Sequence, residues 1–226
     1  MKKYRRNFPG QGLIEYGIFI ALGSVAVIYA LSLFGVSVKD IYRGILLSLA
    51  GESNIVTLFS DEFENLDSWS TLNNGFWWGD WSAEDGKLVG SELASTFLDD
   101  FSGTDYSINL DSVALDQIHS SWNGFGVFFR TNDVDNLDGY IFEVEKVSSS
   151  SSGVLMFRKW ENGNQINTPL ASTALPADFD WDNPGDIRID VQGDTFSAYI
   201  NDTQVLTVQD DSWQDGGVGV AVNYGS

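Results

Sequence analysis

Hydrophobic and polar residues follow two different patterns along this chain. The stretch from Tyr16 to Val38 contains no charged residue. At about 1.5 Å of rise per helical residue, a run of this length crosses a hydrocarbon layer of roughly 30 Å. The apolar pattern stays helical in character as far as Leu47, so it predicts one long hydrophobic helix over residues 11–50.

Beyond Gly51 the period changes, and apolar residues alternate with polar ones in short runs separated by Gly, Asn, Asp and Ser. This alternation is typical of half-buried strands, and Asn162-Gly163 and Asn201-Asp202 are typical of hairpin turns. No second helical pattern interrupts the series, so we expect an antiparallel β-sandwich after the helix. The predicted strands are Lys87–Glu92, Asp105–Leu110, Phe125–Arg130, Tyr140–Val147, Val154–Trp160, Asp186–Val191, Thr195–Asn201, Gln204–Val208 and Val218–Asn223.

The net charge also differs between the two parts of the chain. Residues 1–50 carry a net charge of +4 and residues 51–226 carry −24. Nucleic acids and anionic lipid surfaces both require cationic patches, so the acidic part is not expected to bind nucleic acid. The chain has no Cys, which excludes disulfides and thiolate metal sites. Its one histidine, His119, is better explained as a loop residue than as part of a catalytic triad.

Three interpretations of the apolar segment compete. A cleaved secretory signal has an apolar region of roughly 7–15 residues, which is shorter than this one. A plain membrane anchor fits the length, and the cluster Lys2, Lys3, Arg5 and Arg6 would keep the N-terminus cytoplasmic and export the rest. Glu15 favours a third interpretation, because a carboxylate at the edge of an apolar helix is costly unless it has a partner.

The stretch Phe8–Gly17 has the sequence FPGQGLIEYG, and it resembles the leader of Tad/Flp-type (type IVb) pilins. The resemblance implies that a prepilin peptidase removes residues 1–10 by cutting between Gly10 and Gln11. Glu15 and Tyr16 then take the Glu-Tyr places of the family, where Glu15 would pair with the N-terminal amine of a neighbouring subunit. Gly12 offers a second cut, but it would put Glu15 at position three, which departs from the family pattern.

The remainder of the chain resembles the concanavalin A-like lectin/glucanase domains, in the branch with laminin-G-like and DUF1080-like members. The resemblance implies a jelly-roll sandwich over residues 59–226, joined to the helix by a linker at 51–58. It is evidence for a fold that hosts binders, enzymes and spacers alike. The motifs that carry it are Phe59–Phe63, Asp85–Gly90, Gly124–Arg130, Asn136–Phe142, Ile187–Asp194 and Gly216–Val220.

A cluster of tryptophans makes glycan binding a candidate function. Trp77, Trp78 and Trp81 lie within a few residues of one another, next to Phe76. Sugar rings present apolar C–H faces that stack on exposed aromatic rings. The alternative is that these rings pack inside the sandwich, since Trp is heavily buried on average.

Catalysis is a weaker candidate. Glu143 and Glu145 are spaced to share one face of a strand, and a retaining glycosidase needs two carboxyls roughly 5–5.5 Å apart. The glucanase motif carries three alternating acids, and the flanking places here hold Ile141 and Val147. In so acidic a domain one such pair is expected by chance, so we do not expect an enzyme.

Two acidic groups could bind Ca²⁺, which requires six to eight oxygen ligands. Asp133, Asp135 and Asp138 crowd one predicted loop. A second set would join the two ends of the domain through Asp61 and Glu62 on one side and Asp210 and Asp211 on the other. The alternative in both cases is a solvated acidic surface.

These features together predict a pilin subunit of a helical homo-oligomeric filament. It would reside in the cytoplasmic membrane before assembly and on the cell surface afterwards, and the resemblance implies a prepilin peptidase and pilus assembly machinery as partners. Its sandwich would serve adhesion, glycan binding or sheathing. The alternative is a membrane-anchored extracellular domain that binds or acts on carbohydrate.

Overall fold

The structure is a computed structural model that describes residues 57–73, 76–115, 123–132, 136–146 and 153–225. The chain divides into two compact units, Met1–Glu62 and Phe63–Ser226. The described part of the second unit contains strands and no helix. The strands are β1 (Trp69–Leu72), β2 (Trp81–Glu84), β3 (Lys87–Gly90), β4 (Glu92–Leu98), β5 (Tyr106–Val113), β6 (Asn123–Asn132), β7 (Asp138–Lys146), β8 (Val154–Glu161), β9 (Asn164–Gln165), β10 (Ala171–Ala174), β11 (Gly185–Gln192), β12 (Thr195–Ile200), β13 (Thr203–Gln209) and β14 (Gly217–Gly225).

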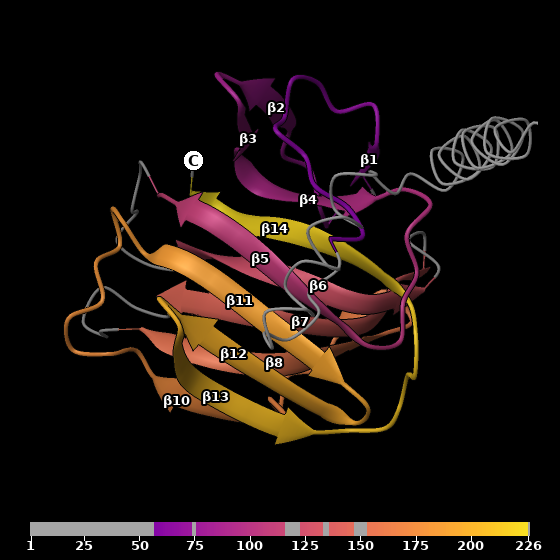
Figure 1. The fold of residues 1–226 in the computed structure, drawn as a ribbon, viewed down its shortest axis with the longest axis vertical. Helices are drawn as coiled ribbons and strands as arrows, with labels where there is room; N and C mark the ends of the chain where they lie inside the picture. Colours follow the sequence, from indigo (N-terminus) through magenta and orange to yellow (C-terminus); the bar gives the residue numbers. More distant parts are fainter. Residues whose placement is uncertain (1–56, 74–75, 116–122, 133–135, 147–152, 226) are drawn as a thin grey trace, which may run out of the picture. The chain divides into compact units, whose positions relative to one another are not determined.

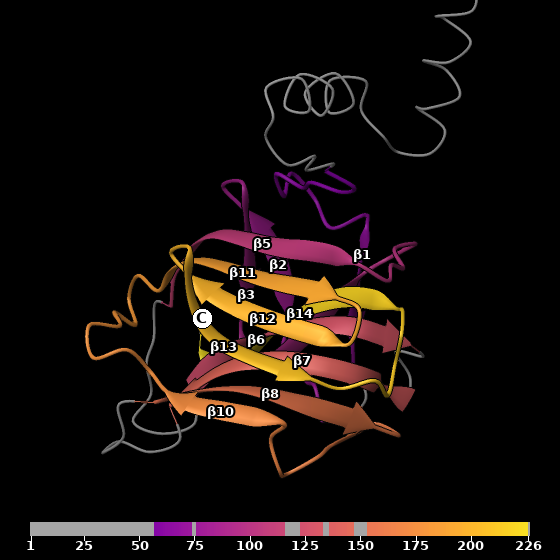
Figure 2. The ribbon, with the colours of Figure 1, turned by 60° about the horizontal axis from the view of Figure 1, so that its bottom comes forward.

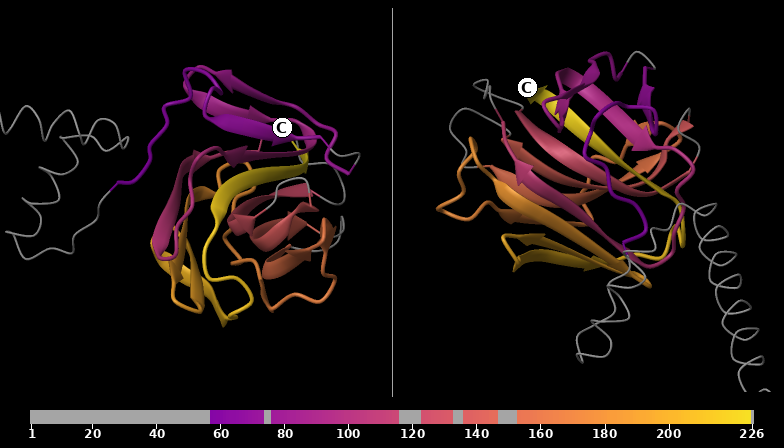
Figure 3. Two further views of the ribbon diagram at one scale, coloured as in Figure 1. Left: turned by 90° about the vertical axis from the view of Figure 1, so that its right-hand side faces the viewer. Right: turned by 45° about the horizontal axis from the view of Figure 1, so that its top comes forward.

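Two antiparallel sheets form the layers of a jelly-roll-like sandwich (Figures 1 and 2). The larger sheet has the order β1-β4-β14-β6-β7-β8-β10, with β9 paired to β8. The smaller sheet has the order β13-β12-β11-β5, and β2 and β3 form a separate hairpin. Figure 3 shows that β14, the last strand, runs through the larger sheet beside strands from the middle of the chain. The C-terminal strand therefore contributes side chains to the same face as β6 and β7.

The main core lies between the two sheets. Alternate residues of β6, β7 and β8 pack against alternate residues of β11 and β12, as the two-residue period of a strand requires. Arg188 and Asp190 of β11 lie on the opposite face, where they are half-exposed. This arrangement confirms an antiparallel sandwich, and the clear alternation of β11 and β12 explains why sequence predicts them well.

A second apolar cluster covers the other face of the larger sheet. Phe128 of β6 and Ile141 of β7 alternate with the main-core residues, and they pack with Trp77 and Trp160. The segment at 76–79 is fixed there by hydrogen bonds from the backbone N–H groups of Trp78 and Gly79 to the carbonyl of Leu93, both 2.9 Å. Both faces of β6 and β7 are therefore covered, which leaves few exposed positions on these strands.

The predicted strands correspond to β3, β5–β8 and β11–β14, with differences at their ends. The sequence prediction missed β1, β2, β4, β9 and β10, and it placed Glu92 in the same strand as Lys87 although β3 ends at Gly90 and β4 begins at Glu92. Strand β4 has no simple alternation, because six of its seven residues are buried.

The predicted leader, the predicted hydrophobic helix and residues 51–56 of the predicted linker lie outside the described residues, and so do Gly10, Gln11, Glu15 and Tyr16. Within the part of the chain that the structure describes, no helix is long and apolar enough to cross a membrane.

Candidate functional site

A charged group lies on the second face of the larger sheet, away from the main core. Glu143 of β7 is 2% exposed, and its Oε2 is 3.1 Å from Nε of Arg158 on the neighbouring strand β8. Its other oxygen, Oε1, accepts a hydrogen bond of 2.6 Å from Nε2 of Gln165. Oε1 therefore has a hydrogen-bond donor, whereas Oε2 lies beside the charge of Arg158 without a hydrogen bond, and Nε of Arg158 donates to Sδ of Met156 at 3.1 Å.

Glu145 extends this group towards the surface. It lies two residues after Glu143 on the same face of β7, and it is half-buried. Its Oε1 accepts a hydrogen bond of 3.3 Å from Nδ2 of Asn223 on β14. The group Glu143, Glu145, Arg158, Gln165 and Asn223, which we call the polar cluster, thus joins four strands: β7, β8, β9 and β14.

Gly124 of β6 makes the contact between Glu145 and Asn223 possible. The strand register places Gly124 opposite Glu145 on one side and opposite Asn223 on the other. A Cβ at this position would lie 2.0 Å from the carbonyl oxygen of Val144, so the two strands approach too closely for any side chain. With no side chain at 124, the amide of Asn223 reaches across the strand to the carboxylate.

The two acids of the polar cluster hold their protons more tightly than usual. Burial, followed by the charge of Glu145, raises the pKa of Glu143, against the opposing effect of Arg158 and Gln165. Burial also raises the pKa of Glu145, against the opposing effects of Arg158 and Asn223. Chemically, the cluster offers carboxylate oxygens and amide N–H groups, which are suitable partners for hydroxyl groups.

The three candidate tryptophans have different environments. Trp77 is 2% exposed and packs against Phe128 and Trp160, with ring centroids 6.1 and 5.6 Å away. Trp77 belongs to the second apolar cluster, so its prediction as a stacking platform is corrected: its ring has no free face for a sugar. Trp81 is half-buried, and its ring packs against Gly90 on the paired strand β3.

Trp78 is 49% exposed, more than Trp77 or Trp81. Its backbone N–H donates to the carbonyl of Leu93, and Leu93 is the register partner of Asn223. The row across the sheet at this level is therefore Leu93, Asn223, Gly124 and Glu145. An exposed aromatic residue is held at one end of a row that ends in a hydrogen-bonding carboxylate.

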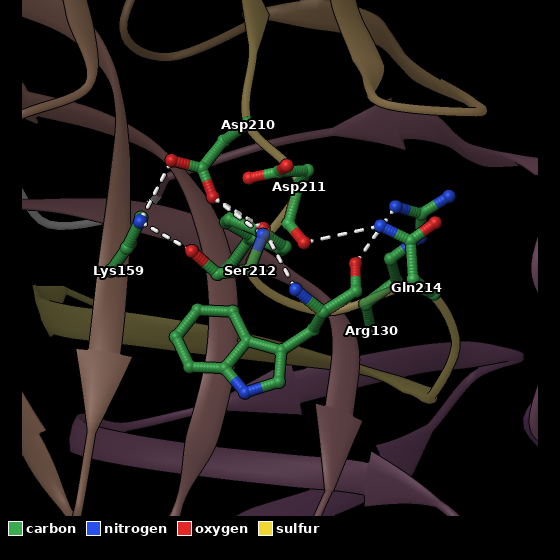
Figure 4. Close-up of polar contacts among 8 residues, drawn as sticks. Arg130, Lys159, Asp210, Asp211, Ser212 and Gln214 are labelled. Atoms are coloured by element: carbon green, nitrogen blue, oxygen red, sulfur yellow. Dashed lines mark hydrogen bonds and ion pairs between the residues drawn. The ribbon is translucent and has the colours of Figure 1, made fainter.

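Asp210 and Asp211 lie on the connection between β13 and β14 (Figure 4). Asp210 forms an ion pair with Nζ of Lys159 at 2.7 Å and accepts hydrogen bonds from the Tyr140 hydroxyl at 2.7 Å and the Ser212 N–H at 3.0 Å. Burial opposes ionisation, but these donors together lower the pKa of Asp210 to about 2. Asp210 thus holds the β13–β14 connection in place, and both of its carboxylate oxygens accept contacts from protein groups.

Nothing in the described residues supports the predicted calcium sites. Among those residues, no group of three or more Asp, Glu, His or Cys side chains is arranged to hold a metal ion. Asp61 and Glu62 belong to the first compact unit and Asp210 and Asp211 to the second, so a calcium site that joins them stays a prediction. Asp138 accepts a hydrogen bond of 2.6 Å from the Asn162 N–H, and Asp133 and Asp135 lie outside the described residues. Calcium binding at that loop stays a prediction.

Comparison with known proteins finds one related sequence and several structures with a similar fold. No protein-family model matches the chain. The levanase of Bacillus subtilis is 26% identical over 159 residues, which cover 70% of this chain and 21% of that enzyme. The chain thus spans about a fifth of the length of this relative.

Among solved structures, the carbohydrate-binding module CBM66 from Bacillus subtilis has a TM-score of 0.56 at 21% identity, covering 71% of this chain and 91% of the module. A Bacillus subtilis protein of unknown function with a galectin-like fold has a TM-score of 0.53 at 15% identity, covering 74% and 96%. These similarities show that the fold is a jelly-roll-like β-sandwich.

Sequence reasoning found Glu143, Glu145 and Trp78 but missed Arg158, Gln165 and Asn223. The alternation in Val154–Trp160 does place Arg158 on the face opposite the main core, which is the one signal that the sequence offered. The pairing of β14 with β6, which brings Asn223 to Glu145, depends on a register between residues about 100 positions apart and has no local signature.

Proposed function

We propose that the sandwich is a carbohydrate-binding domain whose site lies at the polar cluster and Trp78. The observation that carries this proposal is the position of the exposed Trp78 at the end of the row that leads through Asn223 to Glu145. An aromatic ring for the apolar face of a sugar and fixed polar groups for its hydroxyls are the usual elements of such a site. The names of the levanase and the carbohydrate-binding module support the same class of ligand.

The charge of the site favours a neutral glycan. Two carboxylates, Glu143 and Glu145, are matched by the single cation Arg158 within the polar cluster. Residues 51–226 carry −24, so a polysaccharide rich in carboxylate or sulfate would be repelled as it approached. Neutral polysaccharides, of which levan is one, are the expected class.

Binding is favoured over hydrolysis. A catalytic carboxyl has to reach the glycosidic oxygen or the anomeric carbon, whereas the Glu143 side chain is 3% exposed and lies between Gln165 and Arg158. The raised pKa of Glu143 would suit a general acid and keeps glycoside hydrolysis as the second candidate. Release of reducing ends from a bound polysaccharide would distinguish the two.

The setting of this domain is the second part of the proposal. Residues 8–47 carry the pilin resemblance, and on that basis we propose that the sandwich is displayed on a surface filament whose core is the N-terminal helix. A membrane-anchored monomer would carry the same binding site. Shearing of cells followed by electron microscopy and mass spectrometry of the released filaments distinguishes these settings.

Affinity electrophoresis tests the binding function. The full-length protein, purified in detergent, is run through gels containing levan, galactan or mixed-linkage β-glucan. We expect at least one polysaccharide to retard it, and we expect Trp78→Ala to weaken that binding about tenfold, equal to about 1.4 kcal/mol. Phe59→Ala, which removes another exposed aromatic ring, is the matched control and should bind normally. Unretarded migration of the wild-type protein in all three gels would refute the proposal.

A further inference from the structure

A pocket of about 380 Å³ opens at the other end of strands β4, β6 and β14. The polar cluster lies at the ends of these strands that contain Leu93, Gly124 and Asn223. The pocket lies at their opposite ends, which contain Leu98, Asn132 and Gly217. Its volume is at the small end of the range for small-molecule sites, roughly 300–1,000 Å³. The described residues that line it are Phe97, Leu98, Phe101, Ser102, Thr131, Asn132, Asp215, Gly216, Gly217 and Val218.

A strained piece of backbone forms one wall of this pocket. The β6–β7 and β6–β14 registers both shift near Arg130, which has a φ of 48°, in the left-handed region that is unfavourable for a non-glycine residue. The Arg130 side chain compensates by donating to the carbonyls of Thr104, Gly193 and Trp213 at 2.7–2.9 Å. This bulge sets the direction in which the next two residues, Thr131 and Asn132, leave the strand.

A glycine pair fixes the opposite wall. Gly103 and Gly216 exchange backbone hydrogen bonds of 3.0 and 3.2 Å, which hold Phe101 and Ser102 beside the start of β14. Gly216 has a φ of 150°, and a Cβ there would lie 2.5–2.7 Å from the backbone of Arg130 and Thr131. Strained or bulged backbone that is held this firmly is found preferentially at functional sites.

The chemistry of the lining matches a sugar. Phe97 and Phe101 supply apolar surface, and Ser102, Thr131, Asn132 and Asp215 supply hydroxyl, amide and carboxylate groups. Among the described lining residues there is no Lys, Arg or His, so an anionic ligand would find no counter-charge. A neutral, hydroxyl-rich ligand with an apolar face satisfies both kinds of surface.

We propose that this pocket is a second subsite for the same neutral glycan, and the proposal rests on the carbohydrate-binding function above. From Val218 to Asn223 strand β14 advances five residues, about 17 Å at roughly 3.3–3.4 Å per residue. A polysaccharide presents many equivalent sugar residues and can occupy both subsites of one domain. A disaccharide is too short to occupy both subsites at once. Its affinity therefore does not increase through the higher effective concentration that a polysaccharide has at the second subsite.

Titration calorimetry on the full-length protein tests this arrangement. The ligands are the polysaccharide retained in the electrophoresis experiment and the disaccharide made from the same sugar. Asp215→Asn and Asn132→Ala alter exposed pocket side chains, and Asp182→Asn makes the same charge change at an exposed aspartate outside the described lining. We expect each pocket variant to weaken polysaccharide binding at least fivefold, with unchanged melting temperature, and Asp182→Asn to bind like the wild type.

Each outcome separates the two proposals. Normal polysaccharide binding by both pocket variants, with loss in Trp78→Ala, overturns the second subsite and leaves the binding function standing. Loss in the pocket variants with normal binding in Trp78→Ala supports the pocket and overturns the site at Trp78. A wild-type protein that binds none of the three polysaccharides overturns both.

Discussion

Glu143 is a buried carboxyl group, and its burial has an electrostatic cost. A carboxylate taken out of water loses several kcal/mol of solvation, and here Arg158 and Gln165 return part of that loss. Hydrophobic residues of similar volume would often serve stability equally well. The fold retains a charged pair on the face away from the main core, where it keeps polar groups available beside Glu145 and Asn223.

The protonation of Glu143 gives a testable pH dependence. Its pKa is raised above the ordinary value of 4.5, so above pH 4.5 the folded state holds a proton that the unfolded state has released. Stability should therefore fall as the pH rises from 4.5 towards the raised pKa. We expect Glu143→Gln to flatten this part of the stability curve, measured by urea unfolding between about pH 2 and 9.

Asp210 provides an internal control for the Glu143→Gln experiment, because the pKa of Asp210 is lowered whereas that of Glu143 is raised. Its pKa is lowered to about 2 from 3.8, so its contribution is present above pH 3.8 and is lost as the pH falls through about 2. Glu143→Gln should leave this acid limb unchanged. A variant with the wild-type slope above pH 4.5 would show that Glu143 is not the group that titrates there.

At the scale of the elements, close strand approach explains a glycine that looks ordinary in the sequence. Gly124 is not in the left-handed region, and yet a Cβ would lie 2.0 Å from the Val144 carbonyl oxygen. We expect Gly124→Ala to force β6 and β7 apart and to destabilise the fold by about 1–3 kcal/mol, as overpacking does. Urea denaturation of the full-length protein measures the change.

Gly193→Ala separates this steric effect from the cost of backbone conformation. Gly193 has a φ of 52°, and a Cβ there would meet no atom within 4 Å. Its substitution should cost about 1–2 kcal/mol through φ alone, with normal polysaccharide retention. Gly124→Ala should also weaken retention, because it disturbs the row from Asn223 to Glu145. Equal retention by both variants would contradict the placement of the site.

The elements also show what the sequence could predict. In strands β11 and β12 apolar and polar residues alternate, because one face of each strand is buried and the other is in contact with solvent. A short stretch of sequence is therefore enough to predict them. Strand β4 is buried on both faces, and β10 is short and polar, so neither has a local signature. The candidate site shows the same limit. Glu143 and Glu145 are visible in the sequence as a spaced pair, whereas Asn223 reaches Glu145 only through the register between β14 and β6.

At the scale of the whole molecule, the chain joins a basic, apolar N-terminal part to a strongly acidic sandwich. Of the exposed positions on the sandwich, most are polar or acidic, whereas Trp78 and Phe76 are about half exposed. If the helix forms a filament core, a shell of −24 per subunit keeps neighbouring fibres apart and leaves neutral glycans free to approach. The pilin resemblance implies in addition that the basic segment is removed from the mature subunit.

Processing at Gly10 is therefore the prediction that decides the setting of the molecule. The pilin resemblance places the cut between Gly10 and Gln11, which removes Lys2, Lys3, Arg5 and Arg6 and puts Glu15 at position five. Intact-mass measurement of the surface protein should give a chain beginning at Gln11. A bulky residue at the cut site should block cleavage, so Gly10→Leu should accumulate as the full-length chain, whereas Gly12→Leu should still be processed. A surface protein that retains residues 1–10 would be a membrane-anchored domain, with the carbohydrate-binding site unaffected.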